Sequence, residues 1–316
     1  MLALKPLPLL VLVSFVCAGQ DANFSTDVNV VNLFATVRDG SGRVVNDLTK
    51  NDFTLEEDGR PQTIRYFAQE SGLPLTLGLL VDTSVSQERV LGEERIASYR
   101  FLSQVLRPSK DRAFIIQFDS QVELLQDLTS SRDRLGDALA RLETPAQKKP
   151  KHKRGTPNIG RWAIAGTDLY DSILLASDEL MRNQSGRKAL ILLTDGVDNG
   201  SQVSLSHAIE SAQVADTMVF SILFADSHAY EGVYASINGK KVLQRISQET
   251  GGVFFQVSND KPISSIYAQL QEELRNQYSI GYTPDRSGDI PGYRKISLVA
   301  KRAGLLVLTR DGYYSH

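Results

Sequence analysis

The chain has 316 residues, which leaves room for about two domains of ~150 residues each. Its composition, with 41% apolar and 23% charged residues, is typical of a soluble globular protein. The formal net charge of -2 at pH 7 provides no global argument for binding nucleic acid or an anionic membrane.

The first residues follow the order of a secretory signal peptide. Lys5 precedes an apolar run at residues 7–16, and the small residues 17–19 follow it. The run is shorter than the ~20 apolar residues that a membrane-spanning helix needs. We therefore predict that residues 1–19 are a signal peptide, cleaved after Ala18 or Gly19, and that the protein is periplasmic or secreted. A buried core helix or a retained anchor is the alternative, and no later stretch is apolar enough to span a membrane.

Cys17 is the only cysteine, and this cleavage would remove it. The mature protein would then have no disulfide, no thiolate metal site and no cysteine nucleophile. Lipidation of Cys17 is an alternative, but the residues before it, 14–16, are a poor match to a lipoprotein signal. We expect core packing and a metal ion to stabilise the exported chain.

Residues 20–72 form a first segment of short strands separated by turns. Apolar side chains recur near every second position over residues 28–38, with a slip at Val31 and Asn32 that indicates a bulge. Turn signals at residues 39–42 and at Asp58-Gly59 flank further strands at residues 53–57 and 62–67. Short strands at this spacing favour a small β-sandwich.

In residues 73–258, strands alternate with helices. Four near-continuous apolar runs predict strands buried on both faces, at residues 75–81, 112–118, 189–194 and 218–224. Shorter strands are predicted at 122–128 and 253–257, and helices at 87–106, 131–142, 169–181, 204–215 and 242–249. In the first helix, Ile96, Tyr99, Leu102 and Leu106 are expected to share one apolar face. The alternation predicts an α/β fold with an open, doubly wound, mostly parallel sheet and right-handed connections.

Residues 259–316 have a third pattern. An amphipathic helix is expected at residues 263–276, and alternating strands at 278–282, 293–300 and 305–309. About three strands do not easily bury a core alone, and the N-terminal segment has the same problem. We predict that the two flanks form one discontinuous β-domain, with the α/β domain inserted between them.

Oxygen-bearing side chains follow the buried strands. Asp82, Ser84 and Ser86 come directly after the first buried strand, Thr167 opens a helix, and Asp195 follows the third buried strand. The carboxyl ends of parallel strands meet at one edge of such a sheet, where ligands bind. Mg²⁺ prefers oxygen ligands in an octahedral arrangement, so these residues are candidate metal ligands. The alternative for the serines is capping of the next helix.

The motifs DTSVS, GTDLYDS and LLTDGVDN, in this order, resemble the von Willebrand factor A domain over residues 73–258. They match its metal-ion-dependent adhesion site (MIDAS) at all five positions. The resemblance implies direct ligation by Asp82, Ser84 and Ser86, ligation by Thr167 directly or through water, and a water-mediated role for Asp195. It also implies that a Glu or Asp of a partner protein often supplies the sixth ligand.

The flanks extend the resemblance to nearly the whole chain. The phrases NLFATVRDGSGRVV, LTKNDFTLEEDGRPQTI, QYSIGYTP and LLVLTRDGYY look like the exported bacterial "VWFA-related" proteins abundant in Acidobacteria. That likeness implies no particular ligand or activity.

The charge of the candidate site favours capture of an acidic ligand. Two carboxylates and three neutral hydroxyls would leave the cation electrophilic towards an incoming carboxylate. We expect Mg²⁺, with Mn²⁺ or Ca²⁺ as alternatives. Other acidic residues nearby are expected to have local roles: helix capping for Asp168 and Asp171, and turn formation for Asp119, Asp198 and Asn199.

A basic loop at residues 144–165 interrupts the α/β pattern and contains no acidic residue. Its proline and glycine residues argue against regular structure. It is either a solvated loop or a basic rim that steers an acidic partner towards the metal. Its cationic residues are Lys148, Lys149, Lys151, Lys153, Arg154 and Arg161, and its Trp162 is either buried or an exposed anchor.

Catalytic signatures are absent from the sequence. The four histidines lack metal-ligand spacing, and there is no Gly-x-Ser-x-Gly elbow or Walker A motif. Neither Ser84 nor Ser86 has a base placed for it. We predict a non-enzymatic, exported adhesion protein that captures a carboxylate-bearing protein and not nucleic acid. The alternatives are a cell-envelope scaffold with a structural metal, and a metal-dependent hydrolase.

Overall fold

The computed structural model describes residues 30–69, 72–145, 166–224, 233–285 and 291–315. The predicted signal peptide and most of the basic loop lie outside these residues. Among the described helices, none combines the length and apolar character needed to cross a membrane.

A six-stranded sheet forms the centre of the α/β part, in the order β10-β9-β8-β5-β6-β7. All of these strands run parallel except β7, which is antiparallel to β6 at one edge. Every residue of β5 and β8 is buried, as their continuous apolar sequences predict. The strands are β5 (Leu75–Asp82), β6 (Arg112–Phe118), β7 (Val122–Thr129), β8 (Arg187–Thr194), β9 (Met218–Leu223) and β10 (Phe254–Gln256).

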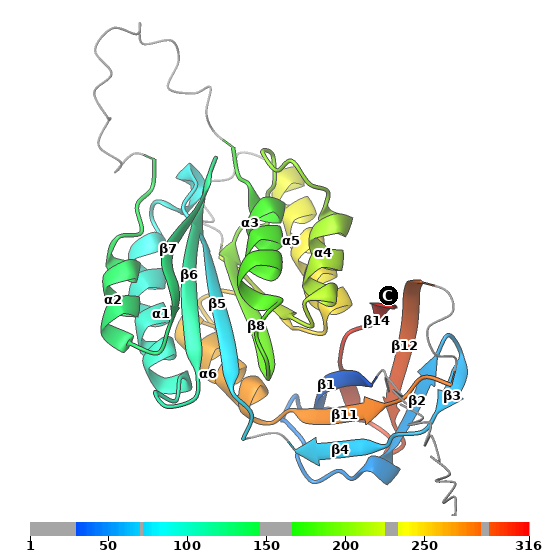
Figure 1. Ribbon diagram of the computed structural model, residues 1–316. Helices are drawn as coiled ribbons and strands as arrows, with labels where there is room; N and C mark the ends of the chain where they lie inside the picture. The colour runs from blue at the N-terminus through cyan, green and yellow to red at the C-terminus, as the bar shows by residue number, and fades with distance from the viewer. Residues whose placement is uncertain (1–29, 70–71, 146–165, 225–232, 286–290, 316) are drawn as a thin grey trace, which may run out of the picture.

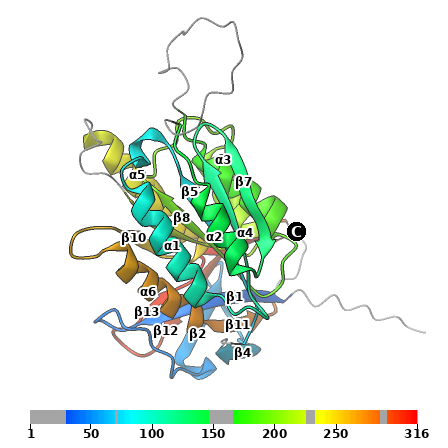
Figure 2. The ribbon, with the colours of Figure 1, turned by 90° about the vertical axis from the view of Figure 1, so that its left-hand side faces the viewer.

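Helices cover both faces of this sheet, which confirms the doubly wound α/β fold (Figure 1). One face is covered by α1 (Leu91–Val105), α2 (Arg132–Ala140) and α6 (Ile263–Arg275), onto which Figure 2 looks. The other face is covered by α3 (Leu169–Leu175), its π-helical continuation (Ala176–Met181), α4 (Leu205–Val214) and α5 (Val233–Thr250).

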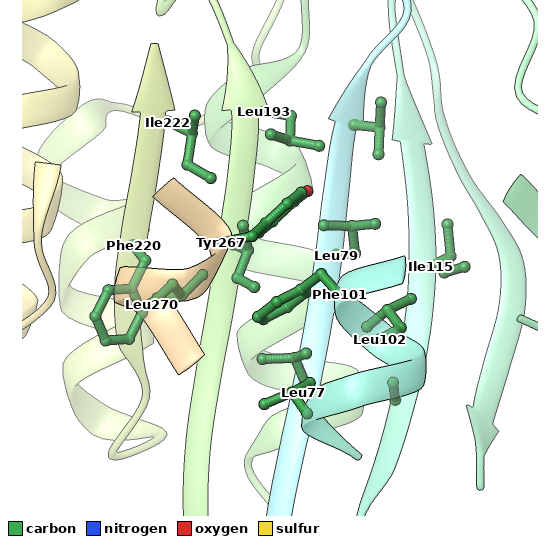
Figure 3. Close-up of a cluster of buried hydrophobic side chains, with 14 of the residues drawn as sticks. Leu77, Leu79, Phe101, Leu102, Ile115, Leu193, Phe220, Ile222, Tyr267 and Leu270 are labelled. Atoms are coloured by element: carbon green, nitrogen blue, oxygen red, sulfur yellow. The ribbon is translucent and has the colours of Figure 1, made fainter. Parts of the chain in front are cut away.

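Side chains of α1 and α6 pack with those of the central strands into one hydrophobic core. Leu77 and Leu79 of β5 face Phe101 of α1 and Tyr267 of α6 (Figure 3). The rings of Phe101 and Tyr267 stack with centroids 4.4 Å apart. Such contacts couple the two helices to each other and to the strand that ends in Asp82.

The buried face of α1 differs from the predicted one. Ile96 and Tyr99 are 59% and 43% exposed, although their spacing with Leu102 suggested a buried stripe. Leu102 and Leu106 are buried as predicted, but the buried face continues through the polar residues Glu94 and Ser98, so the apolar periodicity located this face only in the second half of the helix. The helix also begins later than predicted, at Leu91, after a short 3-10 turn (Val85–Gln87).

The flanks form two four-stranded sheets, ordered β13-β1-β11-β4 and β14-β12-β2-β3. Each sheet combines strands from both ends of the chain, since β1 pairs with β11 and β2 pairs with β12. One core lies between them and includes Leu33, Leu55, Ile280 and Leu298. This confirms the β-sandwich built from both flanks, whose strands are β1 (Val31–Arg38), β2 (Phe53–Glu57), β3 (Arg60–Gln62), β4 (Tyr66–Gln69), β11 (Tyr278–Tyr282), β12 (Gly292–Ala300), β13 (Leu306–Leu308) and β14 (Gly312–Ser315).

Two strand predictions in the flanks need correction. The single strand expected at residues 62–67 is two strands, β3 and β4, because the chain passes from one sheet to the other between them. The short strand β14 was not predicted, because its four residues GYYS lack a clear alternation of apolar and polar side chains.

The position of α6 links the two parts. Although its sequence was grouped with the C-terminal flank, Ile266 and Leu270 pack in the α/β core. Near its end, Glu273 forms an ion pair with Arg38 of β1. The helix therefore belongs to the α/β core and touches the β-domain, while the residue boundaries of the domains stay predictions.

The β-domain lies beside the amino ends of the parallel strands (Figure 1). The chain enters β5 from β4, and the carboxyl ends of β5 and β8 point away from the β-domain. Loops that carry the candidate ligands are thus at the far end of the α/β domain.

Candidate metal centre

Asp82 is the last residue of β5 and is fully buried. Its Oδ1 accepts a hydrogen bond from the Ser84 backbone N–H at 2.9 Å, and its Oδ2 accepts one from the Thr194 hydroxyl at 2.6 Å. The second bond is available because β8, which ends in Thr194, is the neighbour of β5. Both carboxylate oxygens are therefore held by the protein in a defined orientation.

The two serines connect Asp82 to the loop after β8. The hydroxyl oxygens of Ser84 and Ser86 lie 3.0 Å apart, and the Ser86 hydroxyl donates to Asp195 Oδ2 at 2.7 Å. Asp195 Oδ1 accepts from the Val197 backbone N–H at 3.0 Å. Four of the predicted ligands, Asp82, Ser84, Ser86 and Asp195, thus form one contiguous cluster of oxygen atoms.

Thr167 reaches the same edge through its backbone. Its N–H donates to Asn199 Oδ1 at 2.6 Å, and its carbonyl accepts from the N–H of Asn199 at 3.2 Å. The next residue, Asp168, donates its N–H to the carbonyl of Asp119 after β6 at 2.8 Å. Among the described contacts, no hydrogen bond joins the Thr167 hydroxyl to the other four predicted ligands, so its ligand role stays a prediction.

A close approach of two glycines positions Asp195. Gly196 has φ +80°, and a Cβ there would overlap the carbonyl oxygen of Gly239 in α5. A Cβ on Gly239 would overlap the carbonyl oxygen of Asp195. The backbone of α5 therefore packs directly against the backbone of the loop that carries Asp195, and only glycine fits at both positions.

The electrostatics of this cluster favour a cation. Burial, followed by the nearby Asp195 carboxylate, raises the pKa of Asp82 to about 7, and hydrogen bonds from Thr194 and Ser84 only partly oppose this shift. Within the described residues, neither Asp82 nor Asp195 forms an ion pair with a basic side chain. Two buried carboxylates and adjacent hydroxyls are hard oxygen donors that suit Mg²⁺, Mn²⁺ or Ca²⁺.

Carboxylates alone do not complete such a site. The described residues contain no cluster of three or more His, Cys, Asp or Glu side chains that fits a metal ion. A cation at Asp82 and Asp195 would therefore depend on hydroxyl oxygens of the kind that Ser84, Ser86 and Thr167 carry.

The neighbouring acidic residues organise the loops. Asp171 lies in the first turn of α3 and accepts hydrogen bonds from the backbone N–H groups of Gln202 and Val203, so it also ties α3 to the loop after β8. Asp168 stands at the N-cap of α3 but makes no side-chain capping bond, contrary to the expected role. Asp119 accepts from the N–H of Gln121 at 3.1 Å, as a turn former does.

Two buried residues of the loop and of α1 do not stand out in the sequence. Gln87 is fully buried, its amide nitrogen lies 3.4 Å from the Ser86 hydroxyl, and its Oε1 has no hydrogen-bond partner. Glu94 of α1 is also fully buried, and neither of its carboxyl oxygens has a partner. A polar residue in an amphipathic helix is normally placed at the surface, so the sequence offers no signal for this burial.

The family model described as von Willebrand factor type A domain matches residues 77–269. An uncharacterized protein of Borreliella burgdorferi is 26% identical over 107 residues, which are 30% of this chain and 31% of that protein. The chain thus spans less than a third of the length of this curated relative.

Two solved structures have a partial similarity to this chain. Proximal thread matrix protein 1 from the mussel byssus, in a structure with a zinc occupied MIDAS motif, is 17% identical, with a TM-score of 0.47. The similarity covers 69% of this chain and 49% of the mussel chain. A von Willebrand factor type A protein from Catenulispora acidiphila is 13% identical, with a TM-score of 0.49, over 84% of this chain and 73% of the other. At these identities and TM-scores the likeness carries no functional argument.

Proposed function

Because this chain belongs to the von Willebrand factor type A domain family, we propose that it is an exported, metal-dependent binding protein. In this proposal Asp82, Ser84, Ser86, Thr167 and Asp195 hold a divalent cation, with Mg²⁺ as the expected ion. The partner is a protein that presents the carboxylate of an Asp or Glu residue to that cation.

The observation that carries the proposal is the continuous oxygen cluster at the carboxyl edge of the sheet. Asp82 is oriented by Ser84 and Thr194, and the Ser86 hydroxyl lies between Ser84 and Asp195. Burial of two carboxylates without a basic partner is unfavourable unless a positive charge is added. A divalent cation supplies that charge.

The charge of the donor set explains why such a site suits capture. Asp82 and Asp195 together carry at most two negative charges, and the serine and threonine hydroxyls carry none. A bound cation would therefore remain an electrophile that attracts a carboxylate from another molecule. Asp82, Ser84, Ser86 and Thr167 would hold the ion, while Ser86 and Val197 keep Asp195 in place beside it.

The surroundings of the serines support binding and not catalysis. Among the described residues, the Ser84 and Ser86 hydroxyls form hydrogen bonds with each other, with Asp195 and with Gln87. Activation of a serine nucleophile needs an adjacent general base such as histidine or lysine, and neither is among these partners. We therefore propose that the protein is not an enzyme.

The placement of the site supports access for a large partner. The carboxyl ends of β5 and β8 point away from the β-domain, so the flanks do not cover this edge (Figure 1). Export rests on the signal-peptide pattern of residues 1–19. Steering of an acidic partner by the basic residues 148–161 is a further part of the proposal.

Two measurements test the proposed function. Mn²⁺ or Mg²⁺ is first titrated calorimetrically into the purified wild type, Asp82→Asn and Thr167→Ala, and both variants should lose cation binding at least about tenfold. The same proteins are then used as baits in pull-downs from the native cell envelope, with and without chelator.

A specific partner should be retained by the wild type with Mg²⁺ and lost with chelator or with either variant. Asp137→Asn, which removes an exposed charge on α2, is the matched control and should behave like the wild type. Partner retention that survives chelator and both substitutions would contradict the proposal. Tight cation binding that raises thermal stability, with no cation-dependent partner, would favour a structural scaffold instead.

A further inference from the structure

Glu94 is the strongest unexplained feature near the candidate metal centre. It lies in the first turn of α1, its exposed fraction is 0%, and neither of its carboxyl oxygens has a hydrogen-bond partner. Burying an unpartnered carboxyl group is costly, so such a group requires a specific explanation. Packing alone does not explain the burial of Glu94, because an apolar side chain of similar volume would fill the same space without the free-energy cost of burying a carboxyl group.

Among the described residues, no basic side chain forms an ion pair with Glu94. Asp82 at the end of β5 and Glu93 on α1 both act on it electrostatically, and both are acidic. Burial raises the pKa of the Tyr267 hydroxyl on α6, and the charge of Glu94 adds to this shift. The Tyr267 hydroxyl is already hydrogen-bonded to the Ser98 hydroxyl, at 2.7 Å. Burial, followed by the charges of Asp82 and Glu93, raises the pKa of Glu94 well above its usual range.

A cation at Asp82 would change this balance. The loop that follows Asp82 passes through the 3-10 turn Val85–Gln87 directly into α1, so Glu94 lies in the first turn of the helix that follows the candidate ligands. After burial, the charge of Asp82 is the largest cause that raises the pKa of Glu94. A dication bound by Asp82 would replace that repulsion with attraction. In a buried, weakly screened environment, such an interaction acts without direct contact.

We propose that Glu94 is an additional carboxylate of the cation site, which acts from the buried face of α1 and strengthens divalent cation binding without being a ligand. The proposal rests on the proposed cation site and adds a residue to it. A buried negative charge near a dication is weakly screened by water, so it favours retention of the cation.

The test uses the full chain and Mn²⁺ as the probe. Mn²⁺ affinity is measured by calorimetry for the wild type, Glu94→Gln and Glu93→Gln, and melting temperature is measured with chelator and with excess Mn²⁺. Glu93→Gln removes the same charge from the same helical turn at an exposed position. Glu94→Gln should bind Mn²⁺ about ten- to a hundredfold more weakly, as is typical when outer groups of a metal site are changed. Glu93→Gln should bind like the wild type.

The melting temperatures separate this role from a structural one. In chelator, Glu94→Gln should melt at or above the wild-type temperature, and its Mn²⁺-induced stabilisation should be smaller. Glu94→Met, which fills the space with an apolar side chain, is the second variant and should show the same pattern. Wild-type Mn²⁺ affinity in Glu94→Gln, or a lower melting temperature of both variants in chelator, would overturn the proposal.

Failure of the proposed function is distinguishable from failure of this inference. If the wild type binds no Mn²⁺, the cation site itself is refuted, and the role of Glu94 falls with it. If the wild type binds Mn²⁺ and Glu94→Gln binds it more weakly, the inference stands even when no carboxylate partner is found.

Discussion

At the scale of single residues, Asp82 combines burial with close approach to a second carboxylate. Its position at the end of β5 withdraws it from water, while the Ser84 N–H and the Thr194 hydroxyl hold both of its oxygens. These hydrogen bonds favour the ionised form, but burial and Asp195 outweigh them. The cation-free protein therefore contains a carboxyl group that gains a proton more readily than an ordinary aspartate.

This predicts an unusual pH dependence in chelator. The pKa of Asp82 is raised from 3.8 to about 7 on folding, so the folded state binds more protons than the unfolded state between these values. The stabilising contribution is fully present below pH ~4 and is lost as the pH rises towards 7. Urea unfolding at several pH values should show this loss in the wild type and a flatter profile in Asp82→Asn. A parallel slope in both proteins would contradict the prediction.

The other residues of the site divide into those that the sequence identifies and those that it does not. Asp82, Ser84, Ser86 and Asp195 were predicted from strand ends, and the fold brings them into one cluster. Thr194 was not singled out, because a threonine at the end of an apolar strand has no distinctive local pattern. Glu94 was missed because its position in α1 suggests a solvated charge, whereas its burial results from packing against the sheet and α6.

At the scale of elements, α5 has a direct structural relation to the candidate site. Its Gly239 packs against the backbone of Asp195 and Gly196, and it leaves no room for a side chain. This contact joins elements that are more than forty residues apart in sequence, so the need for glycine at position 239 is not visible in the local helical pattern.

A substitution in α5 should therefore affect cation binding. In Gly239→Ala the new methyl group would displace the loop of Asp195, and Mn²⁺ affinity should fall by about ten- to a hundredfold. Gly92→Ala in α1 is the control, because a Cβ there meets no atom within 4 Å. It should leave Mn²⁺ affinity unchanged and stabilise the helix by about 0.5–1 kcal/mol. Equal calorimetric affinities for all three proteins would show that the glycine contact does not control the site.

The elements were predicted most accurately where burial is complete. The central strands β5, β6, β8 and β9 match the apolar runs closely, because strands buried on both faces have a simple pattern. The predicted start of α1 was wrong, and its predicted buried face was right for Leu102 and Leu106 but wrong for Ile96 and Tyr99, because the polar residues Glu94 and Ser98 occupy interior positions there. The residue pattern of a helix does not reveal which polar side chain will be buried when the helix packs against the sheet.

At the scale of the whole molecule, the two flanks depend on each other. β1 pairs on one side with β11 and on the other with β13, and β2 pairs with β12, so each sheet needs strands from both ends of the chain. Their common core is built from both segments. Neither flank has enough apolar surface to form this core without the other.

A fragment of residues 20–72 should consequently be unfolded. Without β11 and β12, its strands lose their antiparallel partners and expose residues such as Leu33 and Leu55. Circular dichroism should show no cooperative thermal transition for this fragment, while the full chain unfolds cooperatively. A stable, cooperatively folded fragment would refute the interdependence of the flanks.

Local sequence was sufficient to predict the α/β and β-rich segments, the strands buried on both faces, and the loops that carry candidate ligands. Periodicity, turn residues and strand ends are properties of neighbouring residues, so they can be read without a fold. The spatial pairing of the flanks was inferred from their inability to bury a core separately, but its register depends on contacts between opposite ends of the chain. Three further features could be identified only in the folded structure, because each depends on contacts between elements that are distant in sequence. They are the burial of Glu94, the hydrogen bond from Thr194 to Asp82, and the contact of Gly239 with Asp195.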